Sequence, residues 1–548
     1  MLTTSRRAVV AGFLLSGFAP SLRSRPTAVL HNGKVWTGNP ALPEVAALAL
    51  VDDRIVAAGD SREMLELAGP ATRKVDLGGK RVTPGFNDAH CHLALGGLER
   101  LRYVAADLQS IEAIQGRLRE RAARTPPGTA VIGFLYDDGK TPRPLSRRDL
   151  DEVSTRHPVI VQHRGGHTTF VNSLAYQMAG VDERTPNPKG GEYARGPGGE
   201  LNGLLVDRAS VPFDKLFPGP ASPDEMRAGV AEASRMFASY GITSACDAGA
   251  SPAMLAGYHD ARREGRLATR IYCHIRNRSL DRMLEAGMRT GFGDDMVRVG
   301  AVKLMADGSI SERSALLSEP YHGRGDYRGV QVQTPDEMYA VASKAHAAGW
   351  QIGVHGNGDV AIDQVLTLFE RLRRERPRRD PRFRIEHCTV LNPELVRRIK
   401  AAGALPILFG GYVHFHGPVM GYYGQERLRN MFALRSLLDA GIPAASSSDY
   451  TASPPVPMLW LQSQVTRTDA AGREWGLNQR VTVAEALRAG TLHGAIASFE
   501  EDRKGRLAPG MLADLVVWDS DPLSVDPETL TGIKAERTMT GGRWVHES

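Results

Sequence analysis

The stretch from Thr83 to His92 constrains this chain most, because it places two histidines two residues apart directly after a strand-like run. In a β-strand, residues i and i+2 project from the same face. We therefore expect His90 and His92 to point the same way, with Cys91 facing the opposite side. Imidazole is the commonest metal-binding side chain, so the pair predicts half of a divalent-metal site. The alternative is that two histidines merely lie near one another.

Strand-like and helical stretches alternate along the central part of the chain, which favours a parallel βαβ architecture. Helices are expected over 335–348, 361–374 and 434–440. Eight parallel strands with intervening helices predict an α/β fold, the TIM (β/α)8 barrel, whose reactive groups gather at the carboxyl ends of the strands. The first strand leads into His90, and the others are expected at 241–246, 270–274, 297–305, 351–355, 383–387, 404–408 and 444–449.

Both ends of the chain carry short strand-like pieces separated by turn signals such as Asn32-Gly33. They fall within 27–83 and again within 501–548. Each half is too short to bury a core by itself, so we expect one composite β-sandwich domain rather than two unrelated appendages. The catalytic barrel is then expected over 84–500.

About 150 residues separate the first expected barrel strand from the second, far more than a normal strand-to-helix connection. An inserted subdomain is therefore expected over 99–225, with a helix at 111–123 and strands at 130–134 and 159–162. It leaves from the ligand-bearing end of the first strand, so we expect it to roof the active site. A purely structural embellishment is the alternative.

Residues 1–25 resemble a bacterial twin-arginine signal, with Arg6-Arg7 before a short apolar run that ends near Pro20. The run is too short to cross a bilayer of ~30 Å, so no stable membrane anchor is expected. The formal charge of +6 falls to +2 without the four arginines of this segment, and no basic patch interleaved with aromatics predicts a nucleic-acid partner. We expect an exported protein, periplasmic in a bacterium.

The four cysteines, at 91, 246, 273 and 388, lie far apart and form no Cys-x-x-Cys pair. This spacing is typical of buried strand residues rather than of a disulfide framework. Export would permit disulfides, but the sequence indicates no pairing.

Further candidate ligands fall on the expected barrel strands. His355 closes the fifth strand, His387 the sixth and Asp449 the eighth, and Lys303 lies on the fourth. Because the carboxyl ends of the strands meet at one end of a barrel, these side chains and the first-strand pair should come together. For any one histidine, the alternative is a core residue satisfied by hydrogen bonds. Chance is a poor explanation for four histidines, one aspartate and one lysine at the same end of one barrel.

These segments resemble the amidohydrolase superfamily, and particularly its family 3 branch, which includes YtcJ-like proteins and N-substituted formamide deformylase. The resemblance covers nearly everything from residue 27 to 548. It rests on the segments 84–92, 303–309, 354–359, 385–387, 448–449, 491–495 and 505–515.

The resemblance implies a metal site and a modified lysine. Lys303 would be carbamylated and bridge two metals, which needs a neutral amine of the kind that burial favours. A lysine paired with Asp307, or one that orients substrate, is the alternative. Zinc suits the donor set best; cobalt, manganese and iron stay open, as does the choice between one ion and two. The implied metal ligands are His90, His92, His355, His387 and Asp449.

The predicted reaction is metal-assisted hydrolysis of an amide-type, non-peptide carbon–nitrogen bond in a small molecule. A divalent metal lowers the pKa of bound water from 15.7 to about 7. Asp449 would accept the proton of that water and return it to the leaving nitrogen. The alternatives are a deaminase or lactonase on the same scaffold, or an exported binding or regulatory protein without turnover. A homo-oligomer stays open.

Substrate contacts are expected from the insert and from loops over the barrel. His167, in Arg164-Gly165-Gly166-His167, resembles the insert histidine of the family. A second His-x-His after the seventh strand lies among glycines and predicts a mobile loop rather than another metal site. A surface or packing role is the alternative for each residue. The candidates are His167, Tyr136, Arg313, Tyr321, His414 and His416.

Overall fold

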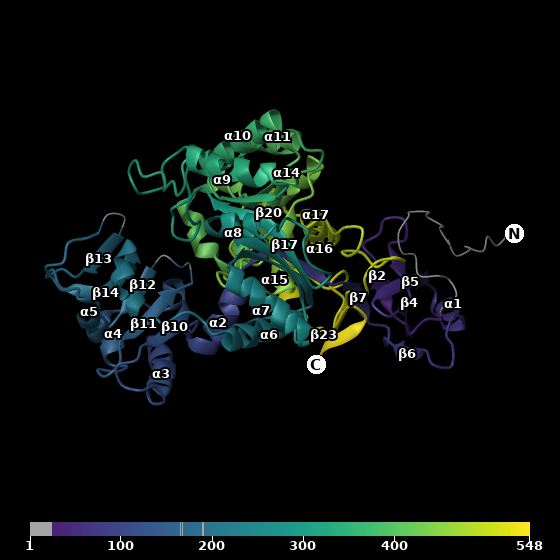
Figure 1. Cartoon of the computed structure of the whole chain (residues 1–548), viewed down its shortest axis with the longest axis horizontal. Helices are drawn as coiled ribbons and strands as arrows, with labels where there is room; N and C mark the ends of the chain where they lie inside the picture. Colours follow the sequence, from purple (N-terminus) through teal and green to yellow (C-terminus); the bar gives the residue numbers. More distant parts are fainter. Residues whose placement is uncertain (1–24, 165, 167, 189–190) are drawn as a thin grey trace.

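The structure is a computed structural model that describes residues 25–548 except 165, 167, 189 and 190. The predicted signal segment, apart from its last residue, and the predicted contact His167 therefore lie outside the described residues. A central barrel separates an inserted subdomain on one side from a β-sandwich on the other (Figure 1). In the part of the chain so described, no helix combines the length and the apolar character needed to span a bilayer.

Eight parallel strands form the central sheet, and each pairs with the next along the chain. The amide of Asp449 donates to the carbonyl of His90 at 2.8 Å and links the last strand to the first. The predicted TIM barrel is thus confirmed. The strands are β8 (Phe86–Cys91), β15 (Ile242–Ala250), β16 (Arg270–Arg276), β17 (Val297–Met305), β18 (Ile352–Gly356), β19 (Arg384–His387), β20 (Leu405–Phe409) and β21 (Ala445–Ser447).

Amphipathic helices cover the outside of the barrel (Figure 1). The longest of them bury an apolar stripe at helical spacing, as Ile362, Val365, Leu366 and Phe369 do on α10. The three expected helices are α9 (Pro335–Ala347), α10 (Asp359–Glu375) and α14 (Leu434–Asp439). The others around the barrel are α2 (Leu93–Arg102), α6 (Pro223–Ser239), α7 (Pro252–Arg263), α8 (Leu280–Glu285), α11 (Pro393–Ala402), α15 (Pro457–Thr466), α16 (Val483–Gly490) and α17 (Leu492–Ala497).

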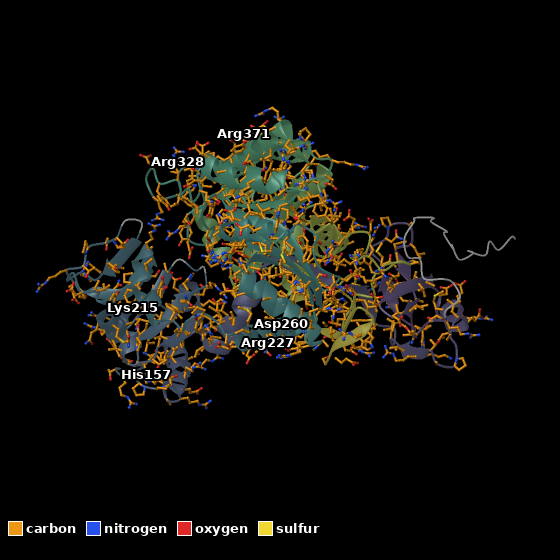
Figure 2. All side chains as sticks on the ribbon, in the orientation of Figure 1. His157, Lys215, Arg227, Asp260, Arg328 and Arg371 are labelled. Carbon is orange, nitrogen blue, oxygen red and sulfur yellow. The ribbon has the colours of Figure 1, made fainter. Side chains whose placement is uncertain are left out.

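Exposed ion pairs join neighbouring outer helices. Arg227 on α6 lies 3.9 Å from Asp260 and 3.1 Å from Glu264, and Figure 2 shows the first two side chains at the edge of the barrel. Such solvated pairs stabilise a fold by little, about 0–1 kcal/mol each. The buried apolar stripes therefore hold these helices in place.

All four cysteines lie on or directly after barrel strands, and all are buried and free. The prediction of buried strand thiols without a disulfide framework is confirmed.

Strands from both termini build the β-sandwich. Its first sheet has the order β5-β4-β1-β6 and its second β24-β23-β22-β7-β2-β3, so β7 from the N-terminal part pairs with β22 from the C-terminal part. Leu30, Leu50, Val82, Leu515 and Val517 share one buried core between the sheets. The strands are β1 (Ala28–His31), β2 (Lys34–Trp36), β3 (Glu44–Val45), β4 (Ala47–Val51), β5 (Arg54–Gly59), β6 (Arg73–Asp76), β7 (Arg81–Pro84), β22 (Leu515–Trp518), β23 (Ala535–Thr540) and β24 (Arg543–Glu547).

A buried ion pair ties the sandwich to the barrel. Arg270, the first residue of β16, donates from Nε and Nη2 to the two carboxylate oxygens of Asp514 at 2.7 and 2.9 Å. The rings of Phe86 and Trp518 meet edge to face nearby, with centroids 6.0 Å apart. Both contacts lie at the amino ends of the barrel strands, so the carboxyl ends are left for the insert and the loops.

The insert is a six-stranded mixed sheet with the order β13-β14-β12-β11-β10-β9. The expected helix is α3 (Ile111–Ala122), and the two expected strands are β10 (Val131–Tyr136) and β11 (Val159–His163). Two hydrophobic cores lie against the sheet, one containing Leu118 and Phe170, the other Ile160 and Phe213. The further elements are β9 (Val104–Ala105), α4 (Arg147–Asp151), β12 (Thr168–Val171), α5 (Ser173–Ala179), β13 (Gly191–Arg195) and β14 (Leu201–Asp207).

Helices α2 and α6 lead into and out of the insert and cross with their backbones in contact. Gly97 lies against Gly229, and a Cβ added at Gly97 would overlap the carbonyl of Gly229. Glycine is therefore required at Gly97 for this close approach. The two ends of the insert consequently lie side by side.

Asp514→Asn is expected to lower the free energy of unfolding by about 3–5 kcal/mol, because it leaves the buried Arg270 guanidinium without its counter-charge. Equilibrium urea unfolding followed by circular dichroism measures the change. The exposed Asp502→Asn is the matched control and should stay within about 0.5 kcal/mol of the parent. Equal stability of the two variants would contradict the structural role of the pair.

Candidate active site

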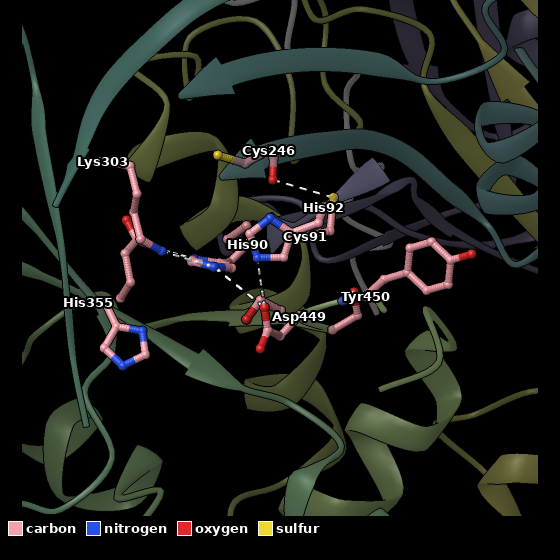
Figure 3. Close-up of polar contacts among 12 residues, drawn as sticks. His90, Cys91, His92, Cys246, Lys303, His355, Asp449 and Tyr450 are labelled. Atoms are coloured by element: carbon pink, nitrogen blue, oxygen red, sulfur yellow. Dashed lines mark hydrogen bonds and ion pairs between the residues drawn. The ribbon is translucent and has the colours of Figure 1, made fainter. Parts of the chain in front are cut away.

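The first-strand histidines meet at one carboxylate. Strand β8 ends at Cys91 because α2 begins two residues later, so His92 lies just beyond the strand in which it was expected. The Nε2 atoms of His90 and His92 still both lie 3.5 Å from Oδ1 of Asp449 (Figure 3). Cys91 points away and its thiol contacts the carbonyl of Cys246 at 3.4 Å. The structure thus brings the two imidazoles together on one side.

Asp449 is held by the contacts that close the barrel. It follows β21 in a left-handed backbone conformation, with φ +51°. Its amide donates to the carbonyl of His90, and the preceding Ser448 donates from its amide and its hydroxyl to the buried carboxylate of Asp88. Strained backbone of this kind persists only where the surroundings fix it. The carboxylate of Asp449 is therefore fixed against the histidines of β8.

His387 and His355 complete the imidazole group. His387 ends β19 with φ +72°, and its ring stacks on Phe409 with centroids 4.3 Å apart. Its centroid lies 4.6 Å from that of His90 and 4.5 Å from that of His355. Ligand atoms of His90, His387 and Asp449 lie within 4.8 Å of one another.

The ring nitrogens are oriented as in metal-binding histidines, which donate their second N–H to a carboxylate or carbonyl. Nδ1 of His90 lies 2.6 Å from Oε2 of Glu386, and Nε2 of His355 lies 2.9 Å from the carbonyl of Gly308. We assign the N–H of His90 to Nδ1 from its carboxylate partner, so the lone pair of Nε2, 3.3 Å from Lys303 Nζ, faces the group where a cation would bind.

The buried Nδ1 of His387 has no hydrogen-bond partner among the described residues. Burial holds the pKa of His90 and of His387 well below the usual range, so both rings are neutral, the form that binds metal. An orphaned buried nitrogen beside neutral imidazoles and a carboxylate fits a divalent cation.

Lys303 lies on β17 and faces this group. Its buried Nζ lies 3.3 Å from Nε2 of His90 (Figure 3), and burial lowers its pKa. The alternative pairing with Asp307 is not found: that carboxylate accepts backbone N–H groups of Leu316 and Asn357 instead. Lys303 is therefore an amine at the donor set rather than half of a structural ion pair with Asp307.

A buried Arg384–Glu386 pair supports His90 and was not assigned a role from the sequence. Arg384 donates from Nε to Glu386 Oε1 at 2.7 Å and from Nη2 to Oε2 at 3.1 Å. Burial disfavours the charged carboxylate, but the Arg384 guanidinium outweighs it and lowers the pKa of Glu386 to about 2. The signal in the sequence was an arginine and a glutamate two residues apart on one buried strand.

Two expected substrate contacts have structural roles instead. The hydroxyl of Tyr136 lies 3.0 Å from Oγ1 of Thr141 and accepts from the amide of Leu145 at 2.9 Å. The hydroxyl of Tyr321 donates to the carbonyl of Ala315 at 2.9 Å. Both tyrosines are buried within hydrophobic cores, so their hydroxyls hold loops rather than face a substrate.

Three other expected contacts lie in the segments after β17 and β20, with His414 in the short helix α12 (Tyr412–Phe415). The guanidinium carbon of Arg313 lies 4.3 Å from the ring centroid of Tyr422. Nδ1 of His414 lies 3.2 Å from the carbonyl of Thr468, and His416 is buried. Their contact with a substrate stays a prediction.

The insert touches the carboxyl-end rim of the barrel. Lys140 Nζ and Arg164 Cζ lie 4.2 and 4.4 Å from the ring centroid of Phe415, the last residue of α12 after β20. His163 Nδ1 lies 3.9 Å from Oε1 of Glu312, in the loop after β17. These contacts agree with an insert at the edge of the site, and its role as a roof stays a prediction.

A closed (β/α)8 barrel that gathers histidines, a lysine and an aspartate at its carboxyl ends defines the class of amidohydrolase-type hydrolases. The sequence profile described as the amidohydrolase family matches residues 73–546, and the chain belongs to this family. It is accordingly a hydrolase that acts on carbon–nitrogen bonds, as predicted.

Similar proteins span almost the whole chain. The putative amidohydrolase YtcJ of Bacillus subtilis is 29% identical, with 95% of this chain and 99% of that protein aligned. The N-substituted formamide deformylase of Arthrobacter pascens is 27% identical, over 94% and 97%. The crystal structure of an uncharacterized metal-dependent hydrolase from Pyrococcus furiosus is 26% identical, covers 91% of this chain and all of its own, and has a TM-score of 0.72.

Glu386→Gln is expected to weaken binding of zinc about 10- to 100-fold, because the neutral amide no longer orients His90. Competition with a chromophoric chelator measures the affinity. The exposed Glu394→Gln on α11 is the matched control. The single change also leaves the buried Arg384 guanidinium without its counter-charge, so the double variant R384M/E386Q is measured as well. If both variants fold and bind zinc as tightly as the parent, Glu386 does not orient His90.

Proposed function

We propose that this chain is a metal-dependent hydrolase that cleaves an amide-type, non-peptide carbon–nitrogen bond of a small molecule. One observation carries the proposal: Asp449 lies within 3.5 Å of Nε2 of both His90 and His92, beside the orphaned nitrogen of His387. A carboxylate among neutral imidazoles is the donor set of a catalytic divalent-metal site.

The residues that would hold the ion are His90, His92, His355, His387 and Asp449. Zinc suits this mixture of nitrogen and carboxylate donors best. The chemistry that such an ion supplies is polarisation of the scissile carbonyl and ionisation of water near neutral pH.

Asp449 is proposed to move the proton. Its carboxylate is partly exposed, whereas His90 is buried, so Asp449 is the group of this pair that a water or a leaving nitrogen reaches. It takes the proton of the attacking water and returns it to the nitrogen as the bond breaks. The fixed backbone around Asp449 keeps the carboxylate in line for both transfers.

Lys303 is proposed to carry a carbamate that joins two ions. Burial lowers the pKa of this lysine, which favours the neutral amine that reacts with carbon dioxide. The position of Nζ, 3.3 Å from Nε2 of His90, would bring carbamate oxygens into the donor set.

We further propose that the protein is exported through a twin-arginine signal and acts in the periplasm on a small-molecule amide. This rests on Arg6-Arg7 and the apolar run after them.

Removal of the metal is expected to abolish hydrolysis, because the donor set alone leaves the carbonyl unpolarised. The purified protein is dialysed against a chelator, assayed on a panel of formamides, N-acyl amino acids, hydantoins and lactones, and reconstituted with zinc. Turnover should return with at least one equivalent of bound metal. Full activity of metal-free protein, or less than one equivalent bound, would overturn the proposal.

Asp449→Asn is expected to lower kcat about 10²- to 10⁴-fold at saturating zinc, because the amide cannot accept the proton of water. Metal content is measured alongside, so that a lost ion is not mistaken for a lost base. The control is Asp439→Asn, an exposed residue at the end of α14. Substantial remaining turnover in metal-loaded Asp449→Asn would refute the proton transfer.

A further inference from the structure

Arg276 ends barrel strand β16 beside the donor set. It is in register with Lys303 on the neighbouring strand β17, and paired residues of parallel strands project from the same face. Its Nε donates to the carbonyl of Gly249 at 2.8 Å. Both Arg276 and His92 pack near Gly249. A Cβ added at this glycine would lie 3.4 Å from Nε of Arg276 and 3.6 Å from Nδ1 of His92. The guanidinium therefore lies next to the His92 ring.

The two terminal nitrogens of this guanidinium form no hydrogen bond or ion pair with any described residue. The acid close enough to act on it, Asp247, already accepts from the hydroxyl of Tyr258 at 2.6 Å and from the amide of Ala94 at 3.0 Å. Burial lowers the pKa of Arg276, and the positive charge of Arg278 adds to the effect. A half-buried cation whose terminal nitrogens have no partner is costly unless something else supplies an anion for them.

The members of the donor set differ in exposure to solvent. The side chain of His92 is 31% exposed and that of Asp449 is 15% exposed, whereas that of His90 is 1% exposed. Arg276 therefore lies beside His92, which is more exposed than Asp449 or His90.

We propose that Arg276 anchors a carboxylate of the substrate, so that the substrate class is an amide with an acidic group a few bonds from the scissile carbon–nitrogen bond, as in an N-acyl amino acid. This inference rests on the proposed amide hydrolysis. Two unpaired guanidinium nitrogens match the two oxygens of a carboxylate and bind them in parallel. The same contact fixes the amide relative to Asp449.

A matched pair of substrates tests the anchor. N-Formylphenylalanine, as both enantiomers, and N-formyl-2-phenylethylamine differ only in the carboxylate. Zinc-loaded enzyme is expected to favour the carboxylate-bearing amide about 10- to 100-fold in kcat/KM. Arg276→Gln should remove this preference through a higher KM for that amide, and Arg276→Lys should keep part of it. Arg278→Gln, an exposed arginine two residues away, is the control and should behave as the parent.

Equal kcat/KM for the two amides in the parent enzyme, or an equal loss on both in Arg276→Gln, would overturn the anchor while leaving the hydrolase intact. If neither amide is hydrolysed, the proposed function fails for this class, and calorimetric binding of the same two compounds decides the anchor. Carboxylate-dependent binding that Arg276→Gln abolishes supports the anion site without turnover. Binding that does not depend on the carboxylate overturns it.

Discussion

The hydrogen bond from the amide of Asp449 to the carbonyl of His90 is the contact on which the rest of the site depends. It joins the last strand of the barrel to the first, at 2.8 Å, and removes the open edges that a sheet would otherwise expose. Both residues also belong to the proposed ligand set. Closing the barrel and assembling the donors are therefore one structural event, and the Asp88–Ser448 contacts reinforce it one residue away.

The two ends of the barrel divide stability from chemistry. The sandwich built from both chain termini attaches at the amino ends, through the buried Arg270–Asp514 pair and the contact of Phe86 with Trp518. The carboxyl ends carry the donors and meet the insert. This division is general for TIM barrels, in which the loops after the strands bear the active site. A rigid amino end lets those loops vary without loss of the barrel.

The pattern of hydrophobic residues was enough to predict most of the fold. The strand ends that carry ligands were predicted from the polar residues that interrupt this pattern. His355 and His387 stand out because each ends an apolar run. Glu386 was not assigned a role, since its partner lies on the same buried strand and only the structure shows that it supports His90. Tyr136 was misassigned because its hydroxyl partners lie in a loop whose path sequence spacing does not define. The strands β13 and β14 were missed because glycine and proline dominate that passage.

The chain enters and leaves the insert through α2 and α6, which cross where Gly97 lies against Gly229. The ends of the insert are therefore neighbours, and its sheet has hydrophobic cores of its own. These are the features of a domain inserted into another domain. A change in the length of the insert is therefore expected to leave the barrel strands and the donors that they carry in place.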